Sequence, residues 1–326
     1  MTLEVIYVTR HGFRSNWVVD PSNGNYTAFL RSPTGGAADP ALTAHGVDQA
    51  NELAEKLLVV EPPVERVYSS IYYRCLQTVE PFVRKATATT AGTSLKIRGE
   101  TGLGEWYGSA DFEHPVPAST ETLRPLFPGL LDPDYRPAVT PSRMGETIDE
   151  LHDRVAATMD ALIAECDRDG VRAILLCSHA AVIIALGRVL TGQMPDDIGV
   201  EDFRAFTCGL SVYRRRQSSV SMTKATRAAV EIENAHNADH PNGKDRQQSG
   251  WKGGRGVCGG WDCELNSDCA HLSLGEERGW RFSGDESFKD TITGRSMLDA
   301  GARPGVVVEG RGKDRGPPTG SHKGKL

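Results

Sequence analysis

The chain has 326 residues, of which 39% are hydrophobic and 25% charged, and its formal net charge is −6. This size and balance suit one sizeable α/β domain with extensions, and the modest negative charge argues against a general polyanion binder. The first residues are typical of a strand rather than a signal peptide, and the longest apolar run, 180–186, is too short to span a bilayer. We therefore expect a soluble protein of the cytoplasm or nucleus, with no membrane partner.

The first predicted strand ends on a group of cations. Residues 6–8 are apolar, as in a buried parallel strand, and Arg10, His11, Gly12 and Arg14 follow them. Ligands bind at the carboxyl ends of strands in open α/β sheets, and a glycine there lets the backbone approach a bound group closely. A histidine between two guanidiniums is unfavourable for stability alone, because clustered cations repel one another. The pattern therefore predicts a site that an anion completes; the alternative is a set of surface residues at a strand end.

A second cationic position follows another predicted strand. A helix over 43–59, with Thr43 as its N-cap, precedes a strand that ends at 67–70. The next helix carries Arg74 in its first turns. Because a helix N-terminus favours anions, Arg74 is expected to add to an anion pocket. His45, in the first turn of the earlier helix, is expected to face solvent.

The second half of the α/β pattern leads to another histidine. A helix over 146–166 precedes an apolar strand over 171–178, and His179 follows that strand directly, before a buried helix. A strand over 206–213 is the last one expected in the sheet core. Two histidines are therefore predicted at the tips of two strands, each leading into a turn or helix.

These residues resemble the histidine phosphatase superfamily, with its phosphoglycerate mutase-like fold. The matching residues occur in family order and are Arg10-His11-Gly12, Leu42-Thr43, Gly46, Gln49-Ala50, Ser69-Ser70, Arg74, Leu103, Glu105 and Ser178-His179. They cover about the first two-thirds of the chain. Segments 10–17, 104–107 and 275–282 also resemble a fungal branch that includes phosphoglycerate mutase family proteins and the tau55-type subunit of the RNA polymerase III factor TFIIIC. The resemblance implies a three-layer α/β/α sandwich with a mostly parallel central sheet.

Carried over residue by residue, the resemblance implies a phosphatase site that needs no metal and no cofactor. His11 is the implied nucleophile, because a neutral imidazole can attack a phosphoryl group. The implied phosphate-binding residues are Arg10, Arg14, Arg74, His179 and Asn16. Asn16 has an alternative role as a turn cap. Cationic donors of this kind stabilise the charge that develops on the phosphoryl oxygens.

The resemblance also implies an acid for the leaving group. Glu105 occupies the matching position, and together with His11 and His179 it completes the catalytic set. Its neighbour Trp106 is expected to desolvate Glu105 and raise its pKa, which would keep the acid protonated at neutral pH. Asp111 and Glu113, from the same loop, are alternative acids.

A segment rich in proline, serine, threonine and acidic residues, 107–143, lies between the two catalytic halves. In the family such an insertion covers the pocket, and its length is nearer to the phosphatases than to the mutases. We therefore expect a metal-independent phosphatase that hydrolyses a phosphomonoester through a phosphohistidine. One alternative is a protein-interaction domain of TFIIIC, with transcription-factor subunits as partners. The other is phosphoglycerate mutase-type phosphoryl transfer.

The composition changes from about residue 215. The catalytic domain is expected to span 1–214, and a polar flexible linker is expected over 215–250. A β-hairpin over 251–285 is expected to pack on the domain. The remaining residues, 286–326, are rich in glycine, proline and basic residues and are expected to be a disordered, solubilising tail without direct nucleic-acid binding.

Seven cysteines is an odd number, which favours free thiols in a reducing compartment over a disulfide framework. Four of them lie in apolar or helical contexts and are expected to be buried: Cys75, Cys166, Cys177 and Cys208. The candidate residues for a zinc site are Cys258, Cys263, Cys269 and His271. Their spacing lacks the paired Cys-x-x-Cys of zinc knuckles, so no metal is expected.

Overall fold

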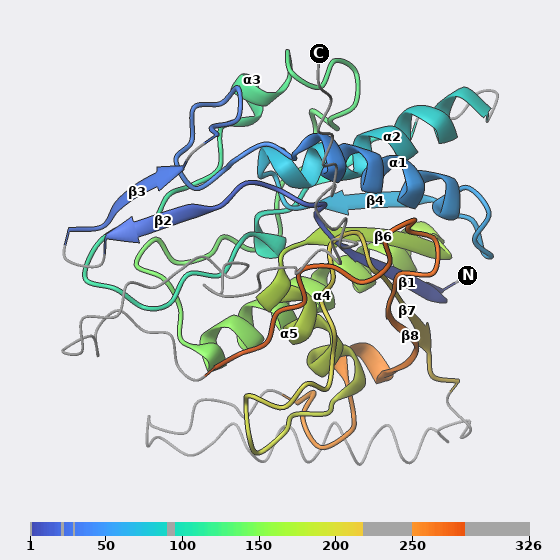
Figure 1. The fold of residues 1–326 in the computed structure, drawn as a ribbon. Coiled ribbons are helices and arrows are strands. Elements are labelled where there is room, and N and C mark those ends of the chain that lie inside the picture. Colours follow the sequence, from blue (N-terminus) through green and yellow to red (C-terminus); the bar gives the residue numbers. More distant parts are fainter. Residues whose placement is uncertain (1, 21–22, 29, 90–94, 218–249, 284–326) are drawn as a thin grey trace, which may run out of the picture.

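The computed structural model describes residues 2–20, 23–28, 30–89, 95–217 and 250–283. A six-stranded sheet, in the order β5-β4-β6-β1-β7-β8, lies at its centre (Figure 1). The strands from β5 to β1 run parallel, whereas β7 is antiparallel to β1 and β8 is antiparallel to β7. The bounds are β1 (Val5–Arg10), β4 (Arg66–Ser69), β5 (Ile97–Gly99), β6 (Ala173–Ser178), β7 (Leu210–Arg215) and β8 (Trp261–Asp268).

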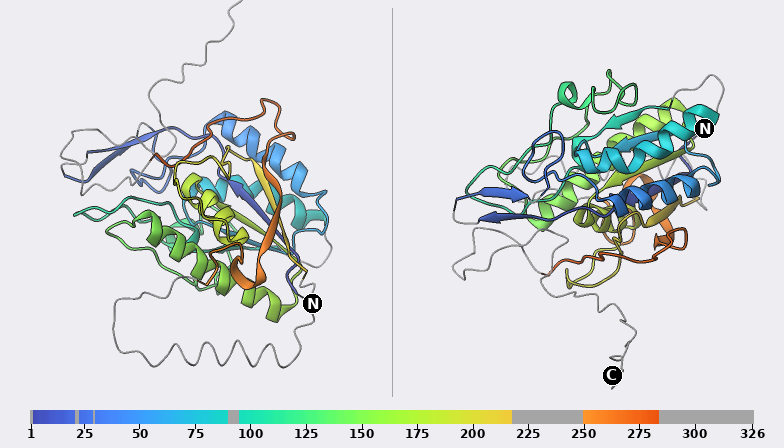
Figure 2. Two further views of the ribbon diagram at one scale, coloured as in Figure 1. Left: turned by 90° about the horizontal axis from the view of Figure 1, so that it is seen from below. Right: turned by 45° about the horizontal axis from the view of Figure 1, so that its top comes forward.

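Helices cover both faces of this sheet. α1 (Ala44–Leu57) and α2 (Tyr73–Thr89) pack on one face, and α4 (Ile148–Asp169) and α5 (Ala180–Thr191) pack on the other (Figures 1 and 2). Each face has its own apolar core, because β1 and β6 are buried along their whole length and present side chains to both layers. The predicted three-layer α/β/α sandwich with a mostly parallel sheet is confirmed.

Side-chain caps fix where two of the helices begin. The Thr43 hydroxyl accepts from the Gly46 N–H at 3.2 Å, which confirms the predicted N-cap of α1. Thr147 and Glu150 form a reciprocal capping box at the start of α4. The helical spacing of Val47, Ala50 and Leu53 predicts that they share one apolar face, but Val47 is 38% exposed, whereas the other two are buried. These caps let the chain turn sharply from the sheet edge into its helices.

A short hairpin projects beyond the sheet and was not predicted from the sequence. Its strands are β2 (Trp17–Asp20) and β3 (Asn25–Ala28), which pair antiparallel (Figure 1). Trp17 is buried, and its ring packs against Tyr107 at 5.9 Å between centroids. The hairpin therefore joins the beginning of the 107–143 segment in one aromatic cluster.

The 107–143 segment divides into two parts. Its only named element is the short helix α3 (Thr120–Leu123), and the chain that follows packs into the core beside α2 and β5. Phe127 is buried there, and Ile97 donates its N–H to the Leu130 carbonyl at 2.8 Å. This second part forms the edge of the domain, so the region expected as one lid is partly core.

The C-terminal part of the domain differs from the prediction. Instead of forming a hairpin, residues 261–268 form β8, which pairs with β7 and becomes the edge strand of the main sheet. The strand over 206–213 is therefore not the last one in the sheet. The prediction failed because β8 and β7 are separated by residues 216–260, and apolar pattern alone does not indicate a partner so far along the chain.

Several expectations fall on other parts of the chain. The predicted linker over 215–250 and the tail over 286–326 lie almost wholly outside the described residues. The four cysteines expected to be buried are buried, and all seven are free thiols. In the part of the chain that the structure describes, no helix has the length and apolar character needed to cross a bilayer.

Candidate active site

The two predicted histidines lie side by side at the carboxyl end of the sheet. β1 and β6 are neighbours, and their register places Arg10 opposite Ser178. The next residue of each strand is therefore His11 or His179, and the two rings are 5.4 Å apart between centroids. The His11 N–H donates to the Ser178 carbonyl at 3.0 Å, which continues the strand pairing into the site. Parallel strands with matched register thus bring together residues far apart in sequence.

The His11 ring is arranged as a neutral base. It is buried, and Nδ1 lies 2.9 Å from the Gly12 carbonyl oxygen. Since a carbonyl only accepts, Nδ1 carries the proton, and Nε2 keeps its lone pair. Burial lowers the pKa of His11 well below its usual value, and the nearby positive charges of Arg74, Arg14 and Arg10 lower it further. His11 is therefore uncharged at neutral pH.

The loop that carries His11 rests directly on the start of α1. The Phe13 carbonyl accepts from the Thr43 N–H at 3.0 Å, and Gly12 donates its N–H to the Thr78 hydroxyl at 3.0 Å. A Cβ on Gly46 would lie 2.0 Å from the Phe13 carbonyl oxygen, so no side chain fits at that position. The glycine of the Leu-Thr-x-x-Gly pattern is thus explained by close backbone contact.

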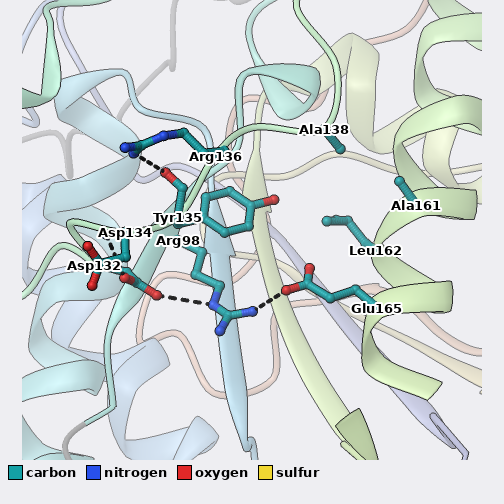
Figure 3. A pocket seen from close by; sticks show the side chains of 9 residues that line it. All are labelled: Arg98, Asp132, Asp134, Tyr135, Arg136, Ala138, Ala161, Leu162 and Glu165. Atoms are coloured by element: carbon teal, nitrogen blue, oxygen red, sulfur yellow. Dashed lines mark hydrogen bonds and ion pairs between the residues drawn. The ribbon is translucent and has the colours of Figure 1, made fainter. Parts of the chain in front are cut away.

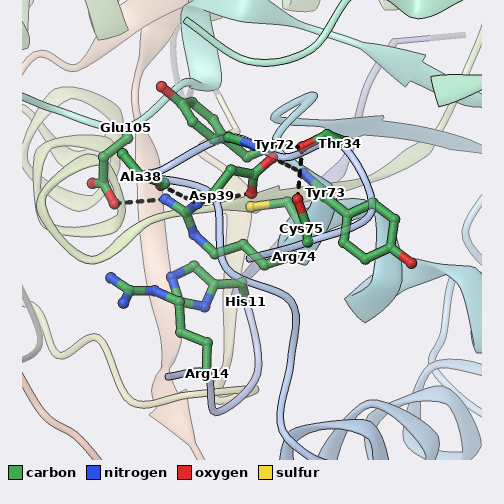
Figure 4. A network of polar contacts seen from close by, with 12 residues as sticks. His11, Arg14, Thr34, Ala38, Asp39, Tyr72, Tyr73, Arg74, Cys75 and Glu105 are labelled. Atoms are coloured by element: carbon green, nitrogen blue, oxygen red, sulfur yellow. Dashed lines mark hydrogen bonds and ion pairs between the residues drawn. The ribbon is translucent and has the colours of Figure 1, made fainter. Parts of the chain in front are cut away.

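Arg74 is the most connected cation of the site. It is buried in the first turn of α2, where its Nη1 donates to Asp39 at 3.0 Å and to the Ala38 carbonyl at 3.0 Å. Its Nη2 lies 3.0 Å from the Glu105 carboxylate (Figure 4). The same Nη2 lies 3.1 Å from Nδ1 of His179. Arg74 thereby links the acidic and imidazole groups of the site.

Glu105 is a carboxylate rather than a protonated acid in this site. Burial raises its pKa, but the charges of His179, Arg74 and Arg14 outweigh burial and lower the pKa far below the usual value. The expectation that Trp106 raises this pKa is therefore wrong. Trp106 does adjoin Glu105, but its backbone N–H donates to the carboxylate and its indole N–H donates to the Glu146 carbonyl at 2.9 Å.

His179 has the opposite protonation behaviour from His11. Its Nδ1 lies 3.2 Å from the Glu105 carboxylate, and its Nε2 lies 2.8 Å from the Ser70 hydroxyl. Burial alone lowers the pKa of His179, but Cys75 and Glu105 reverse that effect and raise it. The site therefore pairs one neutral imidazole with one that retains its proton more strongly.

The remaining predicted phosphate ligands come from the His11 loop and its strand. Arg10 is buried and donates to the Ala205 carbonyl at 2.7 Å and to the Arg278 carbonyl. Arg14 is also buried, and Figure 4 shows its guanidinium beside the His11 ring. Asn16 lies at the half-buried margin of the site, where its side-chain oxygen accepts from Arg278 at 2.8 Å.

The other carboxylates considered as acids lie on the surface. Asp111 is exposed, and Glu113 pairs with Arg143 at 2.5 Å where both side chains are more than half exposed. Neither residue joins the polar network around His11 and His179. The structure thus brings Glu105 into the site and leaves Asp111 and Glu113 outside it.

Several contributing residues were missed by sequence reasoning. Asp39 comes from an irregular loop, and nothing in its local sequence marks it as a partner of Arg74. Arg154, on α4, donates to the carbonyls of Gly102 and Gly104 at 2.7 and 3.2 Å and so holds the loop that presents Glu105. His45 does not simply face solvent, because its ring contacts the Glu277 carboxylate at 2.5 Å. All three contacts join elements that are distant in sequence.

One group of possible metal ligands coincides with this site. The donor atoms of His11, Glu105 and His179 lie within 4.8 Å of one another. The Arg74 guanidinium, however, already contacts both the Glu105 carboxylate and Nδ1 of His179. Positive charge from the surrounding arginines disfavours a cation and favours an anion. The residues present therefore fit a phosphoryl group better than a metal ion.

The residues considered for zinc are not gathered into such a group within the described part of the chain. The Cys258 thiol donates to Asp160 at 3.2 Å, whereas the His271 ring contacts the Cys208 carbonyl at 3.1 Å. Each residue is therefore engaged with a different neighbour.

A separate cavity of about 320 Å³ lies between β5 and α4 (Figure 3). Arg98 is central to it and pairs with Glu165 at 2.6 Å and with Asp132 at 3.3 Å. The charges that line this cavity largely satisfy one another, and none of the residues around His11 lines it. We therefore take the strand ends, rather than this cavity, as the candidate site.

A buried imidazole base beside a cluster of arginines, at the carboxyl end of a parallel sheet, defines a phosphoryl-binding α/β protein. The family model described as "Histidine phosphatase superfamily (branch 1)" matches residues 6–226. The chain belongs to this superfamily.

Curated relatives include both a transcription-factor subunit and phosphatases. The chain is 31% identical over 290 residues to the transcription factor tau 55 kDa subunit of Saccharomyces cerevisiae, a match that covers 86% of this chain and 59% of that protein. It is 29% identical over 215 residues to the ecdysteroid-phosphate phosphatase of Drosophila melanogaster, covering 58% of this chain and 27% of that enzyme. The chain thus spans less than two-thirds of either relative.

Among solved structures, the ecdysone phosphate phosphatase of Bombyx mori in complex with tungstate is 23% identical, with a TM-score of 0.49. That match covers 65% of this chain and 89% of the other.

Proposed function

We propose that this protein is a metal-independent phosphatase that hydrolyses a phosphomonoester through a phosphohistidine on His11. The observation that carries the proposal is the state of His11: a buried, neutral imidazole with Nδ1 held by a carbonyl and Nε2 available for attack. Membership of the histidine phosphatase superfamily supports the same chemistry. The guanidiniums of Arg10, Arg14 and Arg74 supply donors for the phosphoryl oxygens.

The first step transfers the phosphoryl group to the protein. Nε2 of His11 attacks phosphorus, the P–N bond forms and the ester P–O bond breaks, and the leaving oxygen takes a proton from Glu105. Glu105 is ionised without ligand, so it must gain a proton when the substrate binds. The negative charge of a bound phosphate offsets the cations that lower the pKa of Glu105. The raised pKa of His179, whose Nδ1 lies 3.2 Å from the Glu105 carboxylate, favours a proton on that imidazole. The Glu105–His179 pair therefore serves as the proton source.

The second step regenerates the imidazole. A water molecule attacks phosphorus, the P–N bond breaks and phosphate leaves, while the Glu105 carboxylate accepts a proton from the water. His11 returns to its neutral form with Nδ1 still bonded to Gly12. Ser70 and Arg74 keep His179 and Glu105 in place throughout both steps.

The test is hydrolysis of 4-nitrophenyl phosphate in the presence of EDTA. We expect EDTA-resistant turnover in the natural chain and none above background in His11→Ala. Rapid acid-free quenching should also trap a phosphorylated protein whose label is stable to base and labile to acid. A folded protein without turnover, or turnover that survives His11→Ala, would contradict the proposal.

A second role is suggested by the relative that matches most of the chain. The similarity to the yeast transcription factor tau subunit extends over 290 residues, beyond the region matched by the family model. We infer a protein-interaction role in a transcription-factor assembly, located in the nucleus, which is compatible with catalysis by the same domain. Affinity purification of the tagged chain from its own cells should recover other subunits of such a factor. Recovery of the chain alone would count against this role.

A further inference from the structure

The segment 275–282 crosses the carboxyl end of the sheet beside the catalytic loop. The Glu277 carboxylate accepts from Gln49 Nε2 at 2.6 Å and contacts His45, both on α1. Its carbonyl accepts from the Thr207 N–H at 3.1 Å. Glu277, almost one hundred positions after His179, is thus bonded both to α1 and to Thr207. These contacts hold the 275–282 segment beside the site.

Arg278 follows Glu277 and contacts the residues around His11 through both its backbone carbonyl and its side chain. Its carbonyl accepts a hydrogen bond from the guanidinium of Arg10. Its side chain reaches Asn16, to which Nη1 donates at 2.8 Å. Arg278 therefore contacts two of the predicted phosphate-binding residues, Arg10 and Asn16.

The Arg278 guanidinium also lies over the ring of Phe13. Its central carbon lies 3.9 Å from the centroid of the Phe13 ring, a distance typical of stacking. A guanidinium carries five N–H donors and a permanent charge, so it can bind an anion beside its hydrogen bond to Asn16. Phe13, Asn16 and Arg278 are all half-buried, unlike the deeply buried Arg10, Arg14 and Arg74. The side chain thus lies at the margin of the site, outside the ring of cations around His11.

We propose that Arg278 is a specificity-determining residue that binds a second anionic group of the substrate, close to the phosphoryl ester. The inference rests on the phosphatase site proposed above, because it assigns the first phosphoryl group to His11 and its arginines. The substrate class is then a phosphomonoester that bears another phosphate or carboxylate. A substrate with a neutral remainder forgoes this contact and binds less tightly.

The experiment is calorimetric titration of non-hydrolysable ligands, so that binding is read independently of turnover. The ligands are α,ω-bisphosphonates with one to four methylene groups, each compared with the alkylphosphonate of equal length, in the presence of EDTA. Within the series, the distance between the two phosphonate groups increases with each methylene group, so that a range of spacings between the two anionic groups is tested. One or more bisphosphonates should bind the natural chain about tenfold more tightly than the matched alkylphosphonate, as one charge-assisted contact predicts.

Arg278→Met should reduce this preference to within about threefold, because methionine keeps the stem over Phe13 but lacks the charge. Arg278→Lys should retain part of the preference. Arg281→Met is the matched control, since Arg281 is exposed on the same segment and its loss changes the net charge equally. Thermal unfolding of each variant checks that it is folded.

A preference that survives Arg278→Met, falls equally in Arg281→Met, or is absent from the natural chain would overturn the role of Arg278 and leave the phosphatase proposal intact. Failure of the folded natural chain to bind any phosphonate, together with absence of turnover, would overturn both.

Discussion

The ends of β1 and β6 are built alike and behave differently. Each strand is buried throughout and delivers a histidine to the same edge of the sheet, one register position beyond a paired residue. Yet the pKa of His11 is lowered, whereas that of His179 is raised. Arginines surround His11, while His179 also contacts Glu105 and Cys75. The comparison shows that the neighbours contributed by other elements, rather than the strand end itself, determine which imidazole is neutral.

The largest expected effect comes from removing the neutral imidazole. His11→Ala should lower kcat for an aryl phosphate by at least about 10⁴-fold, because the covalent step is lost. His179→Ala should lower kcat less and should still allow phosphohistidine to form on His11. Quenched single-turnover labelling compares the two variants. Equal labelling of both variants would contradict the assigned roles, and labelling only in His11→Ala would reverse them.

The next largest effect is expected from Glu105, whose carboxylate contacts His179 and raises its pKa. Glu105→Gln keeps the shape of the side chain but removes its charge and its proton transfer, so kcat should fall by about 10²–10³-fold. The loss should be smaller for an ester whose leaving group has a low pKa, because such a group needs less protonation. Steady-state rates with a series of aryl phosphates measure this dependence. A uniform loss across the series would show that Glu105 is not the acid.

The pH dependence offers a finer comparison. His11 must be neutral, and its lowered pKa keeps it so well below pH 6.5; His179 must be protonated, and its raised pKa extends activity to higher pH. On the alkaline side, activity should therefore fall about tenfold per pH unit above the pKa of His179. Cys75→Ala removes a neighbour 3.6 Å from Nε2 of His179 and should move this alkaline limb to lower pH. Cys263→Ala, on β8, is the control and should leave the limb unchanged.

The smallest effect tests the hydrogen bond on the far side of His179. Ser70→Ala removes a contact of 2.8 Å to Nε2 in a buried site, worth about 1 kcal/mol, so kcat/KM should fall about fivefold. Ser15→Ala is a matched control, since its hydroxyl contacts the Leu30 carbonyl in an exposed position. An unchanged kcat/KM in Ser70→Ala would mean that Arg74 and Glu105 orient His179 without help from Ser70.

Local sequence was sufficient to place those candidate residues that lie at strand ends and helix starts. The positions of His11, His179 and Arg74 were predicted because an apolar run followed by polar residues indicates where a strand ends and the next turn or helix begins. Thr43 was predicted for the same reason, as an N-cap whose partner is three residues away. The resemblance to a family then supplied Glu105, which composition and periodicity alone did not indicate.

Sequence reasoning failed where the partner lies on another element. Trp106 is adjacent to Glu105 and suggested a raised pKa, but Arg74 and His179, which set the direction of the shift, come from α2 and the end of β6. Asp39 and Arg154 had no local signal, because their roles depend on packing between distant segments. The order of β8 in the sheet was missed for the same physical reason.

The position of β8 has a consequence for how the chain is made. During synthesis, β1 to β7 leave the ribosome before residues 261–268, so the outer edge of β7 emerges well before the strand that covers it in the finished domain. An uncovered strand edge is a template for intermolecular pairing. The nascent protein therefore passes through an interval in which the β7 edge is open to intermolecular pairing, and a message that ends before codon 261 would yield a chain that keeps this edge uncovered.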